Sequence, residues 1–127
     1  NSILYGKTIN SFSSLSLSPL LILFSLDNQS SKLNIFKKSE TITINILSKK
    51  QQIISNNFAK KNPDWKDIEY YLLKNGNPII KNCVSNLDCK IIDKIKKGDH
   101  IIFICKVSRV MNNDKLKPLI YYNSKYF

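Results

Sequence analysis

The sequence is poor in the residues that mark several large protein classes. Its 127 residues include only three glycines, four prolines and three cysteines, which excludes collagen-like, proline-rich and disulfide-dense chains. No apolar run approaches the roughly 20 residues that a membrane-spanning helix needs, so we expect no membrane partner. Hydrophobic residues make up 43% and charged residues 23% of the chain, which is typical of a folded domain.

Metal and disulfide chemistry have few residues available. Cys83, Cys89 and Cys105 are odd in number and form no C-x-x-C pair, and His100 is the only histidine. An odd count without paired spacing argues against a disulfide framework and against a zinc site. We therefore predict no bound metal and a reduced, cytoplasmic protein.

Arginine is almost absent although the chain is strongly basic. The net charge is +11, yet Arg109 is the only arginine among 20 basic residues. Such a charge usually indicates nucleic-acid binding, but phosphate recognition favours the bidentate guanidinium group, and the lysines are scattered along the chain. We predict no nucleic-acid partner and keep a basic nucleic-acid-binding barrel as the remote alternative.

Patterns typical of β-strands dominate the chain. In residues 41–46 isoleucine alternates with threonine or asparagine, a period of two that predicts a strand with one buried face. The sequence Lys-Lys-Gly-Asp at 96–99 predicts a tight hairpin turn between two long strands. Further strands are predicted over residues 3–12, 20–26, 86–95, 100–111 and 118–122.

Short helices interrupt these strands. Ser48 with Gln51 three residues later is a capping box that predicts a helix reaching Phe58. Ser30 or Ser31 is expected to cap a second helix over residues 32–38, and residues 60–78 are predicted to form a long polar loop or lid. Since the pattern shows no β-α-β rhythm, we predict a mainly β, small antiparallel barrel with two or three short helices.

Polar side chains gather at both ends of the apolar stretch 20–26. Serine, threonine and asparagine crowd residues 8–18 before it, and the run Asp-Asn-Gln-Ser-Ser-Lys follows it at 27–32. Hydroxyl groups, a helix start and a lysine would form an anion site. The same residue types are equally typical of turns and caps, so the residues alone leave both interpretations open.

Residues 6–19, G-K-T-I-N-S-F-S-S-L-S-L-S-P, followed by an apolar strand, resemble the signature of the flavin reductase-like family. Further matches follow in family order at 42–47 with Gln51 and 58–59, at 76–80, 87–89 and 98–100, and at 118–122 with Tyr126. The resemblance implies an antiparallel Greek-key split β-barrel, the FMN-binding split barrel, as a single domain over 1–127. The family has about thirty residues before the position of Gly6, which this chain is expected to lack.

The resemblance also implies a binding site. His100 matches the family histidine beside the nicotinamide, and no residue is expected to act as an acid or base, because the cofactors carry out the hydride chemistry. Cys89 is expected to pack in the interior. Phe58 and Trp65 are expected to be core or lid aromatics, with stacking on a ligand as the alternative. The implied flavin-binding residues lie before and after the strand at 20–26: Asn10, Ser11, Phe12, Ser13, Ser14, Asn28, Ser30, Ser31 and Lys32.

By the same resemblance, the chain is expected to be an NAD(P)H-dependent flavin reductase that reduces FMN, or FAD, by hydride transfer from NADH or NADPH. It would form a homodimer and supply reduced flavin to a partner flavin-dependent monooxygenase. The first alternative is a non-catalytic flavin-binding split-barrel protein, which would use the same loops without turnover.

Overall fold

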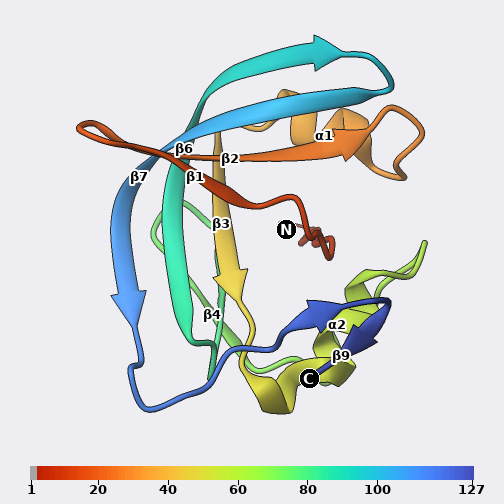
Figure 1. Cartoon of the computed structure of the whole chain (residues 1–127), viewed down its shortest axis with the longest axis vertical. Helices are drawn as coiled ribbons and strands as arrows, with labels where there is room; N and C mark the ends of the chain where they lie inside the picture. The colour runs from red at the N-terminus through yellow and green to blue at the C-terminus, as the bar shows by residue number, and fades with distance from the viewer. Residues whose placement is uncertain (1–2) are drawn as a thin grey trace. The chain divides into compact units, whose positions relative to one another are not determined.

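β-Strands dominate the computed structural model, which describes residues 3–127 (Figure 1). The mainly β prediction is confirmed, with two α-helices and one 3₁₀ helix in this range. None of the helices in residues 3–127 is long and apolar enough to cross a membrane. In chain order the elements are β1 (Ser13–Leu17), β2 (Leu20–Asp27), α1 (Leu33–Lys38), β3 (Thr41–Ile46), η1 (Lys49–Gln51), α2 (Gln52–Phe58), β4 (Tyr70–Leu72), β5 (Pro78–Ile80), β6 (Ser85–Lys97), β7 (His100–Asn112), β8 (Tyr121–Tyr122) and β9 (Lys125–Tyr126).

Five strands form the main sheet, in the order β1-β2-β7-β6-β3. β2 pairs antiparallel with both β1 and β7. Because β7 lies between β2 and β6, the sheet is not a simple meander, and β1 and β3 are its two edges. Two small hairpins, β4–β5 and β8–β9, complete the strands.

The long hairpin of β6 and β7 is confirmed as the sequence predicts it. Its turn consists of Gly98 and Asp99 alone, and Gly98 has a φ of 59°. A two-residue turn with a glycine at positive φ matches the twist of the strands that flank it. His100 is therefore the first residue of β7, directly after the turn.

The chain groups into two compact units, which we describe separately. In the unit of Ile9–Ile42 and Asp88–Arg109, the paired strands β2 and β7 supply most of the buried side chains. Along β2, Ile22, Phe24 and Leu26 are buried and alternate with partly exposed residues. The Phe24 ring stacks on Phe103 of β7, with centroids 4.9 Å apart and planes at 6°. Burial of every second side chain explains why residues 20–26 form a strand.

The other unit contains residues 3–8, Thr43–Leu87 and Val110–Phe127. Its core is formed by Phe58, Ile80 and Cys83, with Trp65 packed against them. The Phe58 and Trp65 rings meet edge to face, with centroids 4.8 Å apart. Phe58 is buried in the core and the partly buried Trp65 packs against it, which agrees with the core role expected for them. A Cβ atom on Gly6 would lie 2.7 Å from Phe58 Cε1, which explains the glycine at this close contact.

The capping box at Ser48 is also confirmed. The Ser48 backbone N–H donates to Gln51 Oε1 at 2.9 Å, and the Gln51 amide Nε2 donates to the Lys81 carbonyl oxygen at 2.7 Å. Gln51, which is only 7% exposed, thus caps the start of η1 and also bonds to the residue that follows β5.

The strand predicted over residues 3–12 is wrong, because the structure has no strand there. Thr8 instead contacts α2: its Oγ1 donates to the Ser55 carbonyl oxygen at 2.6 Å, and its backbone N–H donates to the Phe58 carbonyl oxygen at 3.1 Å. These bonds attach the segment through single contacts rather than through a ladder. The β-like composition alone did not reveal this.

Two other boundaries differ from the prediction. The predicted loop 60–78 contains β4, which pairs with β5; Gly76, with a φ of 87°, provides the turn between them. The strand predicted over 118–122 is confined to Tyr121–Tyr122, while Pro118 makes only an isolated bridge to Ser48. Proline has no N–H to donate to a ladder, which explains the late start of this strand.

We predict that Gln51→Ala lowers the free energy of unfolding by about 2 kcal/mol or more, because it leaves a buried N–H and a carbonyl oxygen without partners. Urea denaturation followed by tryptophan fluorescence measures this change. Gln52→Ala is the matched control, since Gln52 is the exposed neighbour and its change should stay within about 0.5 kcal/mol. Equal midpoints for the two variants would contradict the role of Gln51.

Candidate functional site

All residues predicted to bind the flavin or the nicotinamide lie in one compact unit, that of Ile9–Ile42 and Asp88–Arg109. They occupy three segments: residues 10–14 before and within β1, residues 28–32 after β2, and His100 at the start of β7. Each segment contacts the C-terminal half of β2 or the residues that directly follow it, so the site can be described strand by strand from β2.

The serine-rich segment runs alongside β2. Ser11 Oγ donates to the Ser25 carbonyl oxygen and accepts the Ser25 backbone N–H, both at 3.0 Å. Ser13 and Ser14 are exposed at the start of β1, opposite Leu23 and Ile22 of β2. Because β1 is an edge of the sheet, one side of its backbone has no strand partner in residues 3–127, as a ligand-binding strand requires.

Most backbone N–H groups of the loop after β2 already have acceptors within the protein. The backbone N–H of Asn28 donates to the Asp99 carbonyl oxygen at 2.8 Å. The N–H of Gln29 donates to Asp27 Oδ1 at 2.7 Å, and that of Ser30 donates to the Asp27 carbonyl oxygen at 3.0 Å. A phosphate bound here would therefore depend on the Ser30 and Ser31 hydroxyls and the Lys32 ammonium group.

The expected cap of the following helix is wrong. Lys32, not Ser30 or Ser31, is the N-cap of α1, with a φ of 64° and no side-chain cap bond. The α1 helix has only six residues, so it contributes little of the aligned dipole that a longer helix gives to an anion site. The predicted anion site therefore depends on the hydroxyl and ammonium groups of this loop rather than on the helix start.

His100 lies beside this loop. It pairs with Asp27 across β2 and β7, and Asn28 Nδ2 donates to the Gly98 carbonyl oxygen at 3.4 Å. His100 Nδ1 lies 2.6 Å from Asp99 Oδ1, and the side chains are 45% and 87% exposed. The hydrogen bond and the charge of His100 lower the pKa of the Asp99 carboxyl. A carboxylate can only accept, so Asp99 accepts the hydrogen bond from Nδ1, and Nε2 is the ring nitrogen that remains for another partner.

Two acidic residues that sequence reasoning did not select belong to this cluster. One ligand atom from each of Asp27, Asp99 and His100 lies within 4.8 Å of the others. Three groups of these types are able to approach a metal ion, but exposed acidic side chains commonly lie together without one. The only sequence signal for them was their position next to the predicted loop and histidine.

The cysteines of this unit are interior residues. Burial raises the pKa of the Cys89 thiol to about 12, with further contributions from Cys105 and Asp88, and burial raises the pKa of the Cys105 thiol to about 11. Both are free and buried, so they remain protonated at neutral pH and pack as small apolar side chains. The packing role predicted for Cys89 is confirmed.

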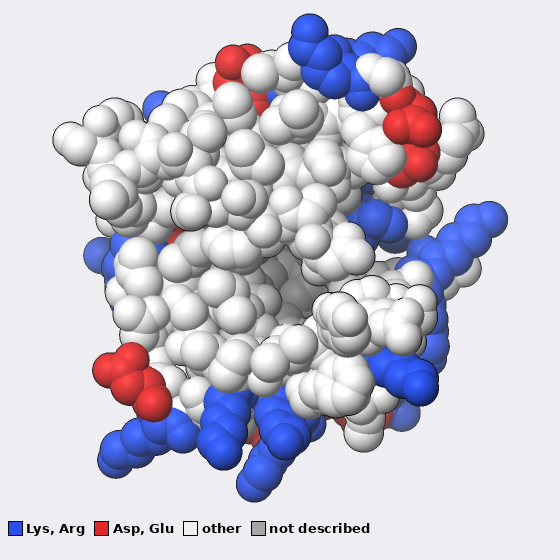
Figure 2. All heavy atoms as spheres, in the orientation of Figure 1, with Lys and Arg blue, Asp and Glu red and all other residues white. Residues whose placement is uncertain are grey.

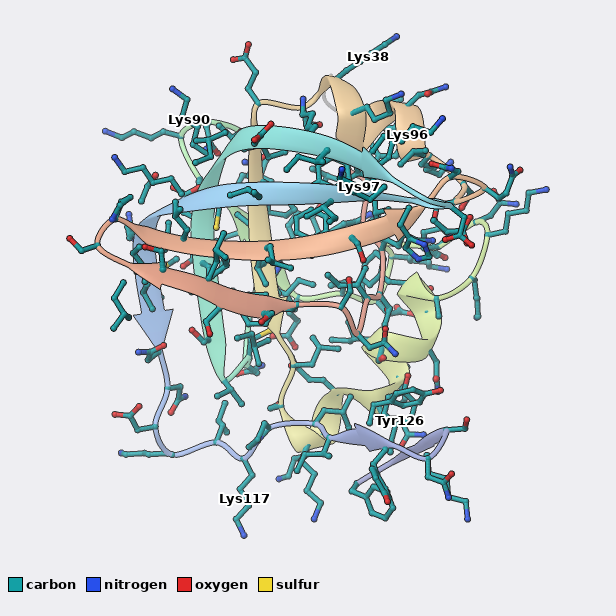
Figure 3. The ribbon with its side chains drawn as sticks, turned by 45° about the horizontal axis from the view of Figure 1, so that its top comes forward. Lys38, Lys90, Lys96, Lys97, Lys117 and Tyr126 are labelled. Carbon is teal, nitrogen blue, oxygen red and sulfur yellow. The ribbon has the colours of Figure 1, made fainter. Side chains whose placement is uncertain are left out.

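The β1–β2 hairpin carries no charged side chain before Asp27. Residues 9–26, which include β1 and most of β2, contain no Lys, Arg, Asp or Glu, and Figure 2 shows this hairpin as uncharged surface. In Figure 3, Lys38 extends from α1, and Lys96 and Lys97 lie close to the β6–β7 turn. Lys96 and Lys97 thus lie near the C-terminal end of β2, where the predicted phosphate loop follows, whereas Lys106 pairs with Leu21 at the start of β2.

The chain resembles known proteins along nearly its whole length. A family model described as "Flavin reductase like domain" matches residues 3–127. An NADH:FMN oxidoreductase of Rhodococcus erythropolis is 32% identical over 128 residues, which cover 96% of this chain and 67% of that protein. The reductase component of a flavin-dependent trigonelline monooxygenase of Acinetobacter baylyi is 35% identical over 128 residues, but this chain spans only 39% of its length.

A solved structure gives the same result for the fold. The NADH:FAD oxidoreductase SgcE6 of Streptomyces globisporus, in complex with NAD and FAD fragments, matches with a TM-score of 0.91 and 26% identity. The match covers 97% of this chain and 76% of that one. This match confirms the fold class predicted from the sequence, a mainly β split barrel. The family model, the Rhodococcus relative and this structure agree, and the chain belongs to the flavin reductase-like domain family.

Proposed function

We propose that the chain is a flavin reductase that binds FMN or FAD at the C-terminal end of β2 and reduces it with NADH or NADPH. One observation carries the proposal: the three predicted segments meet around β2. Ser11 bonds to Ser25 of β2, Asn28 follows directly after it, and His100 pairs with Asp27. Ser25 and Asp27 are two residues apart, about 7 Å along a strand. The segments therefore lie within the dimensions of one flavin.

Each segment has a separate role in this proposal. The stretch from Asn10 to Ser14 contacts the isoalloxazine ring and ribityl chain, with the exposed Phe12 at its centre. Asn28, Ser30, Ser31 and Lys32 hold the phosphate. Supporting this division, the hydroxyl and lysine groups follow β2 on one side and the uncharged surface of residues 9–26 lies on the other, as a ligand with a charged end and an aromatic end requires.

His100 binds the nicotinamide in the proposed site. Since Asp99 Oδ1 lies 2.6 Å from Nδ1, Nε2 is the ring nitrogen left for a nicotinamide carboxamide, which offers both an N–H donor and a carbonyl acceptor. The proposed role of His100 is to orient the nicotinamide ring.

The reaction requires little chemistry from the side chains. The flavin supplies the hydride-accepting nitrogen when it is bound. The residues of this chain align the two rings and limit the access of water. The proposal therefore includes no general acid or base, and it assigns no metal to Asp27, Asp99 and His100.

The partners belong to the same proposal. The Acinetobacter relative is by name a reductase component of a monooxygenase, which supports a role in supplying reduced flavin to a flavin-dependent monooxygenase. A homodimer, a cytoplasmic location and a single domain over 1–127 remain predictions. The free, buried cysteines are compatible with a reducing compartment.

The alternative is a flavin-binding protein of the same fold without turnover. Purified protein mixed with FMN, then with NADH or NADPH, separates the two. A reductase consumes the nicotinamide and bleaches the flavin absorbance, whereas a binding protein changes the flavin spectrum only. A protein that leaves both spectra unchanged would contradict both readings.

We predict that Ser30→Ala combined with Lys32→Ala weakens FMN binding tenfold or more but leaves riboflavin binding within about twofold. Charge-assisted hydrogen bonds contribute about 1.5–3 kcal/mol each, and riboflavin has no phosphate to lose them. Titration of flavin fluorescence measures both affinities. Lys38→Ala, in an exposed lysine at the other end of α1, is the control for net charge. An equal loss for FMN and riboflavin would contradict the phosphate assignment.

We predict that His100→Ala slows flavin reduction several-fold or raises the nicotinamide KM, while FMN affinity stays within about twofold. A lost hydrogen bond contributes about 1 kcal/mol, and misalignment of the rings adds to it. Stopped-flow reduction of the FMN-loaded variant measures the rate. Lys97→Ala, on the same hairpin, is the control. If His100→Ala is reduced as fast as the unchanged protein at every nicotinamide concentration, His100 is not part of the site.

A further inference from the structure

Ser11 occupies the place of a strand residue without being one. In the β1–β2 pair, Ser13 lies opposite Leu23, so a ladder continued by two residues would place Ser11 opposite Ser25. The Ser25 backbone N–H and C=O point toward this position, where they would bond to the backbone of the partner strand. Instead, both bond to the hydroxyl of Ser11, at 3.0 Å each.

The Ser11 hydroxyl therefore takes the place of both the N–H and the C=O of a partner strand. It donates its one proton to the Ser25 carbonyl oxygen and accepts the Ser25 N–H, which satisfies both backbone groups of β2. Because a side chain now fills the gap, the main chain of Ser11 is held away from β2. Among the residues that the structure describes, no backbone group of residues 9–12 bonds to another backbone group.

This arrangement leaves the amides of the serine-rich segment available to a ligand. Among the described residues, the N–H groups of Asn10 and Phe12 have no backbone partner, and both residues are exposed, so an acceptor on a ligand can reach them. The pyrimidine edge of an oxidised isoalloxazine ring carries two carbonyl oxygens and the nitrogen N1, which accept such bonds. The segment thus has donors where the proposed flavin has acceptors.

We infer that Ser11 is a positioning residue for the flavin, which acts through its two bonds to Ser25 and not through contact with the ring. This inference rests on the proposed function. It changes the role that the family resemblance implies for Ser11, because the hydroxyl already uses its only proton and cannot also donate to the flavin. The backbone N–H groups of Asn10, Ser11 and Phe12 are the ligand-binding atoms that Ser11 presents.

Three variants separate the role of the Ser11 hydroxyl from an effect on general stability. Ser11→Ala removes both bonds and should weaken FMN binding about tenfold, whereas Ser11→Thr keeps the hydroxyl and should bind within about threefold of the unchanged protein. Ser39→Ala is the matched control. It too removes a serine hydroxyl bonded to a backbone carbonyl oxygen, that of Ile35 at 2.7 Å, but at the end of α1, and should leave FMN affinity within about twofold.

Amide hydrogen exchange at Ser25 gives a readout independent of activity. With Ser11 in place, the Ser25 N–H should exchange slowly both without and with FMN. In Ser11→Ala it should exchange at least tenfold faster without FMN, because its acceptor is gone. Ser39→Ala should leave the exchange at Ser25 unchanged.

The results separate this inference from the function on which it rests. If the unchanged protein binds no FMN, the proposed function fails and the positioning role with it. If it binds FMN but Ser11→Ala binds equally well, only the positioning role is wrong. Faster exchange of the Ser25 amide on FMN binding would show that the hydroxyl leaves Ser25 for the flavin, and would overturn the inference in favour of direct contact.

Discussion

The pairing of β2 with β7 is the constraint on which the site depends. Phe24 faces Phe103 in this pair, and their stacked rings are almost fully buried. Three positions further along, the same register sets Asp27 opposite His100. A slip of one residue would exchange the two faces of the strand, expose these rings and turn His100 away from the loop. The aromatic pair thus fixes the partner of the histidine.

The sequence predicted the parts of the fold that depend on local signals. The strands at 20–26 and 41–46, the Gly98 turn and the Ser48–Gln51 capping box are each contained within a few residues, and all are present in the structure. The buried face predicted for residues 41–46 is wrong, because all six side chains of β3 are partly exposed. The predictions that failed depend on distant partners. In the predicted strand 3–12, Thr8 is held by α2 and Ser11 by Ser25 instead of by a ladder, and Lys32 caps α1 in place of a serine.

The candidate site divides in the same way. Sequence reasoning identified the three segments because their residue types and order are distinctive. It missed that Ser11 bonds to Ser25, since this follows from the offset between β1 and β2 and not from either segment alone. It also missed Asp99 as the partner of His100, although the two are adjacent, because adjacency in sequence does not fix where side chains point.

The shortness of the β6–β7 turn limits how this hairpin tolerates change. Surface turns usually accept insertions without harm, but here only Gly98 and Asp99 separate the two strands. The bonds from this turn to Asn28 and the register of His100 both depend on that length. An added residue would have to bulge the turn, which moves the carbonyl groups that hold Asn28, or shift β7 by one position and reverse the faces of His100 and Phe103. A change of chain length at this tip therefore disturbs the candidate site as well as the hairpin.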